Sequence, residues 1–182
     1  GEIHFPPAPG AVANRPLPTT KHFVLLGVTI SDTLRFDEHV ARNLLPYVEA
    51  QTGFVRRLTR TTGDARRRCT DLIYTGVVRP KIEYASVVWR GGCTKVVLDK
   101  LQRQQNKFAR IVTGLPLGTS IDALEAEAGW LSLTARHDGA LVRQLHKVAT
   151  LEPTHKLHTT YLRSDRMTTR FFRTALTTYI GM

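Results

Sequence analysis

Cysteine and long hydrophobic runs are scarce in this chain of 182 residues, and each absence excludes a class of protein. Two cysteines, Cys69 and Cys93, are too few for a framework of disulfides or for a zinc site with four thiolates, and they favour a reducing compartment. No apolar run approaches the roughly 20 residues that cross a bilayer, so no membrane span is predicted. The composition, 42% hydrophobic and 23% charged, is that of a folded domain with a core.

Acidic residues are also few, and the imbalance is confined to one segment. The chain has 26 Lys and Arg against 15 Asp and Glu, a net charge of +11. Residues 55–110 contain 14 of these basic residues and four acidic ones, whereas the rest of the chain is close to neutral. A protein that follows phosphates needs its positive charge on one surface. The segment therefore favours nucleic acid as the partner over a merely solvated face or an anionic membrane surface.

The sequence predicts four segments and a mainly α fold. Residues 1–20 hold five of the nine prolines and are expected to form an extended Pro-rich arm. Residues 21–36 include the run HFVLLGVTI, interpreted as one strand, or as half of a hairpin, because Gly27 interrupts it. Helical periodicity dominates residues 37–150, and residues 151–182 are interpreted as a helical tail.

Three amphipathic helices are expected first in the helical segment. A short helix capped by Ser120 or Thr119 and ended by a left-handed Gly129, and then a longer helix capped by Ser132, are expected to follow them. The first begins at Asp37, and Pro46 is expected to kink or divide it because proline lacks a backbone donor. Pro80 implies a bend in the second. The apolar face of the second helix is predicted to be Cys69, Leu72, Ile73, Val77 and Tyr84. The third begins near Thr94, with an apolar face made of Val97, Leu101, Phe108 and Val112.

A basic ridge is predicted on the third helix. Lys100, Arg103, Lys107 and Arg110 recur at spacings of three, four and three, and no acidic residue is interleaved among them. An ordinary solvated face is the alternative interpretation of this pattern. The predicted nucleic-acid-binding residues of the whole segment are Arg56, Arg57, Arg60, Arg66, Arg67, Arg68, Lys100, Arg103, Lys107 and Arg110.

No group of acidic residues or histidines in the sequence has the spacing expected of metal ligands. Asp37 and Glu38 open a helix, where acids usually act as caps. Glu125 and Glu127 are two residues apart on a helix and point in different directions. His155 and His158 lack a further Cys or acid at metal-ligand spacing. The sequence predicts no metal site and no cofactor.

Nucleophilic catalysis is equally poorly supported. His137, Asp138 and Ser132 could be imagined as a triad, but no GxSxG turn or comparable setting for a nucleophile is present. Trp89 and Trp130 could stack a base, yet both are more simply interpreted as core residues between helices. We predict no catalytic residue in the chain.

Five stretches in order resemble one known family. They are LLGVTISDTLRFDEHV, RRLTR, LIYTGVVRPKIEYASVVW, LDKLQRQQNKFARIVTGLP and ALEAEAGWLSL. Together they span roughly residues 20–150 and are similar to the region that follows the palm in reverse transcriptases of non-LTR retrotransposons, the LINE-type elements of the jockey and trypanosomatid kinds. The resemblance implies a thumb-like helical bundle from about residue 37. It also implies that Leu26, Gly27 and Val28 belong to the strand pair that steadies the primer end.

The chain departs from that family where catalysis takes place. The polymerase centre of the family lies in a Tyr/Phe-Ala-Asp-Asp turn with an upstream aspartate, and neither is present here. The family's endonuclease and its Cys/His knuckle are also missing. The expected function is therefore a non-catalytic module that binds the backbone of RNA or of an RNA/DNA duplex, without a membrane partner.

Two alternatives remain open. The first alternative to this expectation is a co-opted structural subunit of a large ribonucleoprotein, such as an organellar ribosome with protein neighbours. The second is a fragment of an active reverse transcriptase. The compartment follows from that choice: a mitochondrion for the ribosomal subunit, the nucleus or cytoplasm for a retrotransposon protein.

Overall fold

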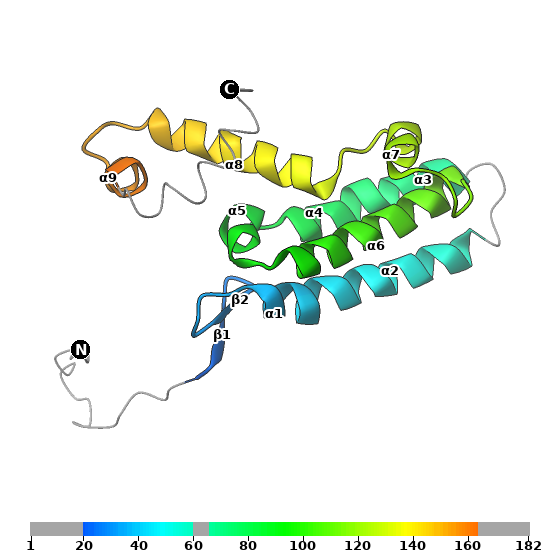
Figure 1. Ribbon diagram of the computed structural model, residues 1–182, viewed down its shortest axis with the longest axis horizontal. Helices are drawn as coiled ribbons and strands as arrows, with labels where there is room; N and C mark the ends of the chain where they lie inside the picture. The colour runs from blue at the N-terminus through cyan, green and yellow to red at the C-terminus, as the bar shows by residue number, and fades with distance from the viewer. Residues whose placement is uncertain (1–19, 60–65, 164–182) are drawn as a thin grey trace.

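The protein is mainly helical, with a short antiparallel hairpin at the N-terminal end of the described chain (Figure 1). The computed structural model describes residues 20–59 and 66–163, so the predicted Pro-rich arm and the end of the predicted C-terminal tail lie outside the described residues. The elements are β1 (His22–Leu25), β2 (Val28–Ser31), α1 (Asp37–His39), α2 (Leu45–Leu58), α3 (Arg66–Ile73), α4 (Arg79–Glu83), α5 (Ser86–Trp89), α6 (Lys95–Thr113), α7 (Ile121–Ala128), α8 (Leu133–Ala149) and α9 (Lys156–Arg163).

The run HFVLLGVTI forms both strands of a hairpin, not one strand. Phe23 pairs with Ile30 and Leu25 with Val28, and the chain reverses at Leu26 and Gly27. Both turn residues have positive φ, 47° and 81°, which is the two-residue geometry that matches the twist of a hairpin. Gly27 supplies this conformation without strain, and it explains why the apolar run is interrupted there.

Each predicted proline break is accommodated by a π-helical turn. The turn Val40–Leu44 joins α1 to α2 just before Pro46, and the turn Tyr74–Val78 joins α3 to α4 just before Pro80. A π-turn shifts the hydrogen-bond register by one residue, so the missing proline N–H leaves the helix continuous in each place. Pro46 and Pro80 therefore neither divide nor end their helices.

The second helix buries a different face from the predicted one. Tyr74, Val78 and Ile82 are fully buried at a spacing of four residues. Leu72, Val77 and Tyr84, predicted as part of the core face, are more than half exposed, and Cys69 is exposed. That prediction was wrong: Cys69 and Leu72 precede the π-turn and already lie on the outer side of α3, and from Tyr74 onward the π-turn keeps the buried residues at a spacing of four. The outer side of α3 and α4 therefore exposes Leu72 beside the charged side chains of Arg68 and Lys81.

The main core lies among α2, the α3–α4 unit and α6 (Figure 1). On α6 the buried side chains include Leu101, Phe108 and Val112, as predicted, while Val97 is half-buried. Trp89 is completely buried and Trp130 nearly so, which confirms both as core residues. The ring of Trp130 stacks on Tyr74 with centroids 4.0 Å apart.

Local capping signals fix the ends of α7 and α8. The Ser120 and Ser132 hydroxyls accept hydrogen bonds from the backbone N–H groups of Ala123 and Ala135, and Gly129 ends α7 in a left-handed conformation. Asp37 behaves differently from the cap that was expected, because its carboxylate accepts hydrogen bonds from the backbone N–H and the hydroxyl of Thr94, at the start of α6.

Among the described helices none is long and apolar enough to cross a bilayer.

Candidate nucleic-acid interface

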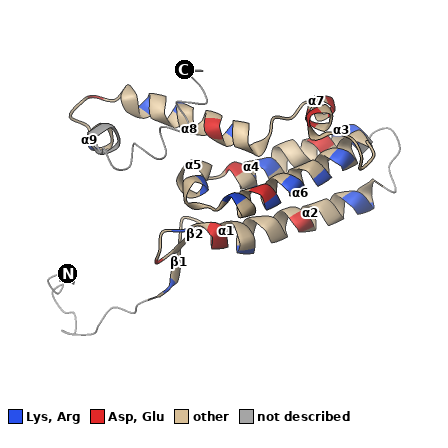
Figure 2. Ribbon diagram, viewed as in Figure 1, with Lys and Arg blue, Asp and Glu red and all other residues tan. Residues whose placement is uncertain are grey.

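The predicted basic ridge lies on the outer face of α6. Lys100, Arg103 and Lys107 are exposed and Arg110 is half-buried, while the opposite face of the helix is buried in the core. At 1.5 Å per residue the four cations span about 15 Å along one rigid helix. Figure 2 shows basic residues following α6 along its length. We call Lys100, Arg103, Lys107 and Arg110 the α6 ridge.

The charges of the α6 ridge have no acidic partner in the part of the chain that is described. None of the ion pairs found there includes a ridge residue. Arg110 is oriented instead by its own helix, because its Nη1 donates to the carbonyl oxygen of Asn106 at 3.5 Å, while its Nε is buried without a hydrogen-bond partner. Four positive charges thus lie along α6 without neutralisation by a described carboxylate.

Buried amides beside the ridge hold α6 in place. Gln104 donates from Nε2 to the Glu49 carboxylate of α2 at 2.7 Å. Gln102 donates to Glu125 of α7 at 3.2 Å, and its carbonyl oxygen accepts from the backbone N–H of Leu133. Sequence reasoning missed these side chains as functional, although the polar run QRQQN within a helix that also bears a core face was a signal for them. They fix the direction in which the ridge points.

The arginines of α2 lie next to one end of the ridge. Helices α2 and α6 run in the same direction, away from the hairpin (Figure 1). Since Glu49 contacts Gln104, the stretch that contains Arg56 and Arg57 comes level with the last turns of α6, near Arg110. Both arginines are exposed and take part in none of the ion pairs among the described residues. They extend the basic surface beyond the ridge.

The arginines of α3 differ in whether their charge is free to contact a phosphate. Arg67 is paired with Glu127 of α7, with Nη1 2.8 Å from Oε1 and Nη2 donating to the carbonyl oxygen of Glu127 at 2.8 Å. Its charge is therefore offset. Arg68 is exposed and takes part in none of those ion pairs. Arg60 and the side chain of Arg66 lie outside the described residues.

Acidic groups border the ridge on both sides. Glu49 lies on the α2 side and Glu125 on the α7 side, each held by a glutamine of α6. Burial and the neighbouring Asp122 raise the pKa of Glu125 above its ordinary value. The uncompensated positive surface is therefore a narrow strip along α6, a shape that suits a row of phosphates.

Groups that could support catalysis are held in structural roles. No set of three or more His, Cys, Asp or Glu among the described residues could hold a metal ion. Burial raises the pKa of the Cys93 thiol to about 12, so it is not a thiolate at neutral pH. His137 packs edge-on against Trp89, and burial lowers its pKa to about 4. Asp138 pairs with Arg90 rather than with His137.

A small cleft lies beside His137. It has a volume of about 60 Å³ and is lined by residues of α6 and α8, among them Gln102 and Thr134, and by Arg90. Sites for nucleotides and other drug-sized molecules are usually about 300 Å³ or larger. This cleft is too small for such a ligand.

No protein-family model matches the chain, and neither a curated protein nor a solved structure shows significant similarity to it.

Proposed function

We propose that the chain is a non-catalytic module that binds the sugar-phosphate backbone of RNA or of an RNA/DNA duplex through the α6 ridge together with Arg56, Arg57 and Arg68. The observation that carries the proposal is the strip of ridge cations, exposed on a rigid helix and unpaired within the described chain. The likeness of the sequence to the post-palm region of LINE-type reverse transcriptases, noted above, points in the same direction.

The physical basis is the release of counterions. Each phosphate that a Lys or Arg neutralises frees condensed counterions from the nucleic acid, so affinity falls steeply with salt and depends little on base sequence. Contacts of Lys and Arg with phosphates fix the position of the protein on the duplex and carry no sequence information. The ridge is suited to this mode because its side chains project from one face.

A duplex suits this surface better than a single strand. Non-specific binding of single strands relies on aromatic side chains that stack the bases. Among the described residues the exposed aromatic side chains are Phe23, Phe54 and Tyr84, on β1, α2 and next to α4, and none is on α6. We therefore propose that a regular double helix, with its phosphates on the outside, is the ligand.

Charge reversal on the ridge tests the proposal. The triple variant K100E/R103E/K107E avoids the half-buried Arg110, and the control R143E/K147E/K156E removes the same charge from exposed positions on α8 and α9. We expect the ridge variant to bind a 20-base-pair RNA duplex or RNA/DNA hybrid at least about 100-fold more weakly than the control. Equal losses in the two variants, with unchanged circular dichroism, would contradict the assignment of the site.

We also propose that the protein contacts other proteins, because part of its surface is both apolar and exposed. On β1 and the following turn, Phe23, Val24, Leu25 and Leu26 are between 51% and 82% exposed, and the hairpin therefore presents a continuous apolar run to its surroundings. Such surface is typical of a contact site. It supports a role inside a larger assembly, either as a structural subunit of a ribonucleoprotein or as part of a longer polymerase. Purification from native cells separates the two: ribosomal RNA co-purifies in the first case, and reverse-transcriptase activity in the second.

A further inference from the structure

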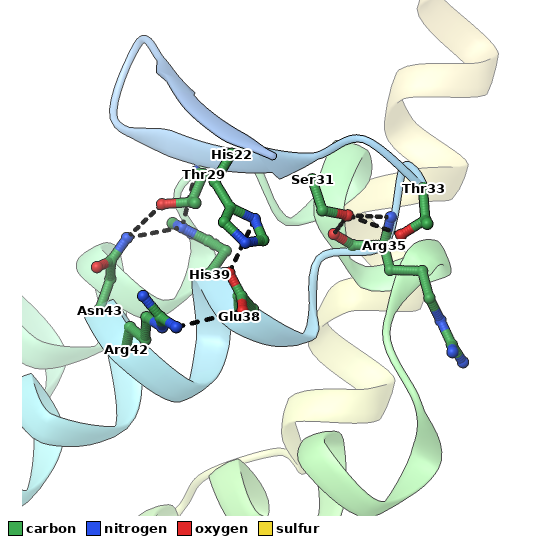
Figure 3. Close-up of polar contacts among 9 residues, drawn as sticks. All are labelled: His22, Thr29, Ser31, Thr33, Arg35, Glu38, His39, Arg42 and Asn43. Carbon is green, nitrogen blue, oxygen red and sulfur yellow. Dashed lines mark hydrogen bonds and ion pairs between the residues drawn. The ribbon is translucent and has the colours of Figure 1, made fainter. Parts of the chain in front are cut away.

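Two histidines take part in the contacts between the hairpin and the helical bundle (Figure 3). His22 of β1 places Nδ1 2.9 Å from Oε2 of Glu38 on α1, and Glu38 also contacts Arg42. His39 of α1 contacts β2 at Thr29.

The contact made by His39 requires a neutral imidazole. Its Nδ1 accepts the backbone N–H of Thr29 at 3.3 Å and lies 3.2 Å from the Asn43 side-chain nitrogen, which also donates to the Thr29 hydroxyl at 2.9 Å. A backbone N–H and an amide NH₂ can only donate, so Nδ1 must carry its lone pair. Protonation of Nδ1 would direct its N–H at the backbone N–H of Thr29 and the side-chain NH₂ of Asn43, and both hydrogen bonds would be lost.

The surroundings of His39 oppose its protonation. The side chain is 3% exposed and packs against the Trp89 ring, with centroids 6.0 Å apart. Burial and the charge of Lys81 lower the pKa of His39 below its ordinary value. The neutral form that the hairpin contact needs is thus the form that the bundle stabilises at neutral pH.

Among the described residues, the other histidines and the acidic side chains near His39 form no hydrogen bond with the backbone of the hairpin. Glu38 is engaged by His22 and Arg42 at the edge of the hairpin. His137 lies on Trp89 as well, and it is buried against the ring from α8. Of the histidines described here, His39 alone accepts a hydrogen bond from the hairpin backbone.

We propose that His39 is a proton-sensitive clasp, in which the neutral imidazole holds the β2 edge of the hairpin against α1 and protonation of Nδ1 releases that edge. This inference concerns the docking of the hairpin and is independent of the proposed nucleic-acid site. The contact is complete above a pH of about 6.5, the ordinary value for histidine, and is lost as the pH falls through the lower pKa of the folded protein.

Amide hydrogen exchange measured by NMR on the full chain tests the clasp. After correction for the intrinsic exchange rate, the protection of the Thr29 amide should fall between pH 7.5 and pH 5 in proportion to the protonated fraction of His39, by up to about tenfold. The amide of the buried Phe108 in α6 should keep its protection over the same range. A parallel loss at Phe108 would indicate global opening and would overturn the proposal, as would constant protection at Thr29.

Two variants locate the sensor. In H39N the side-chain oxygen can accept the Thr29 N–H in place of Nδ1 but does not titrate, so the pH dependence at Thr29 should disappear. In H22N it should persist. The reverse result would assign the effect to the pair formed by His22 and Glu38.

If H39N does not fold, the protonation state of His39 can be measured on the unmodified protein. The ¹⁵N chemical shifts of the His39 imidazole at pH 7.5 should show an unprotonated Nδ1 and a protonated Nε2. A protonated Nδ1 at that pH would overturn the clasp.

Discussion

The hydroxyl of Tyr74 donates a hydrogen bond of 2.6 Å to the side-chain oxygen of Gln105 inside the bundle. Both side chains are buried, and Gln105 in turn donates from Nε2 to the carbonyl oxygen of Leu131 at 3.0 Å. The chain of bonds joins the π-turn after α3, the helix that bears the ridge, and the segment between α7 and α8. Burial raises the pKa of Tyr74 above its ordinary value, so the hydroxyl remains a donor at every physiological pH.

Replacing this hydroxyl should destabilise the protein without touching the proposed site. Y74F leaves a buried amide oxygen without its donor, and we expect a loss of about 1–3 kcal/mol in the free energy of unfolding, measured with urea. The matched control is Y84F, because Tyr84 is 52% exposed and its hydroxyl donates to the carbonyl of Leu26 at the surface. A loss in Y84F as large as in Y74F would contradict the role assigned to the buried bond.

Stability should depend on pH through His137. Burial lowers the pKa of His137 to about 4, so the folded state holds the neutral form while the unfolded chain binds a proton near pH 6.5. The contribution of this group is fully present above about pH 6.5 and is lost as the pH falls toward 4, by roughly 3 kcal/mol. Urea unfolding at several pH values should show this slope, and H137L should reduce it. The exposed His146 supplies the control H146Q, which should retain the slope. A slope equally steep in H137L would count against the burial of a neutral imidazole.

The pair formed by Arg67 and Glu127 should limit binding. Both side chains are about half exposed, so E127Q is expected to change stability by less than about 1 kcal/mol. The same change frees the charge of Arg67 near the end of the basic surface. We expect duplex affinity to rise by about twofold to fivefold at low salt and to return to the unmodified value at high salt. E152Q, a change of the same charge at an exposed position after α8, is the control. An unchanged affinity in E127Q would place Arg67 outside the interface.

The sequence predicted best where local chemistry decides the structure. The serine caps at Ser120 and Ser132 and the left-handed Gly129 follow from short-range hydrogen bonds and sterics. The buried face of α6 follows from a regular period of 3.6 residues, and the ridge follows from the same period on the opposite face. The burial of Trp89 and Trp130 follows from their apolar neighbours in the chain.

Long-range contacts and an irregular helix account for the errors. The face of α3 and α4 was mispredicted because the expected stripe, which includes Cys69 and Leu72, is not the side of α3 that faces the core, and the π-turn before Pro80 then sets a spacing of four that the periodicity does not reveal. The partner of Arg67 lies 60 residues away, so spacing along the chain could not reveal it. Asp37 was taken for a cap of its own helix, whereas it binds Thr94 across the fold.

The salt dependence of duplex binding is the most direct test of the account. For K100Q/R103Q/K107Q, which removes three charges without reversing them, the slope of log affinity against log salt concentration should be less steep by about 2 to 3 than for the unmodified protein. The control R143Q/K147Q/K156Q should retain the original slope. A ridge variant whose slope equals that of the unmodified protein would show that these cations do not contact phosphates, and would contradict the central claim.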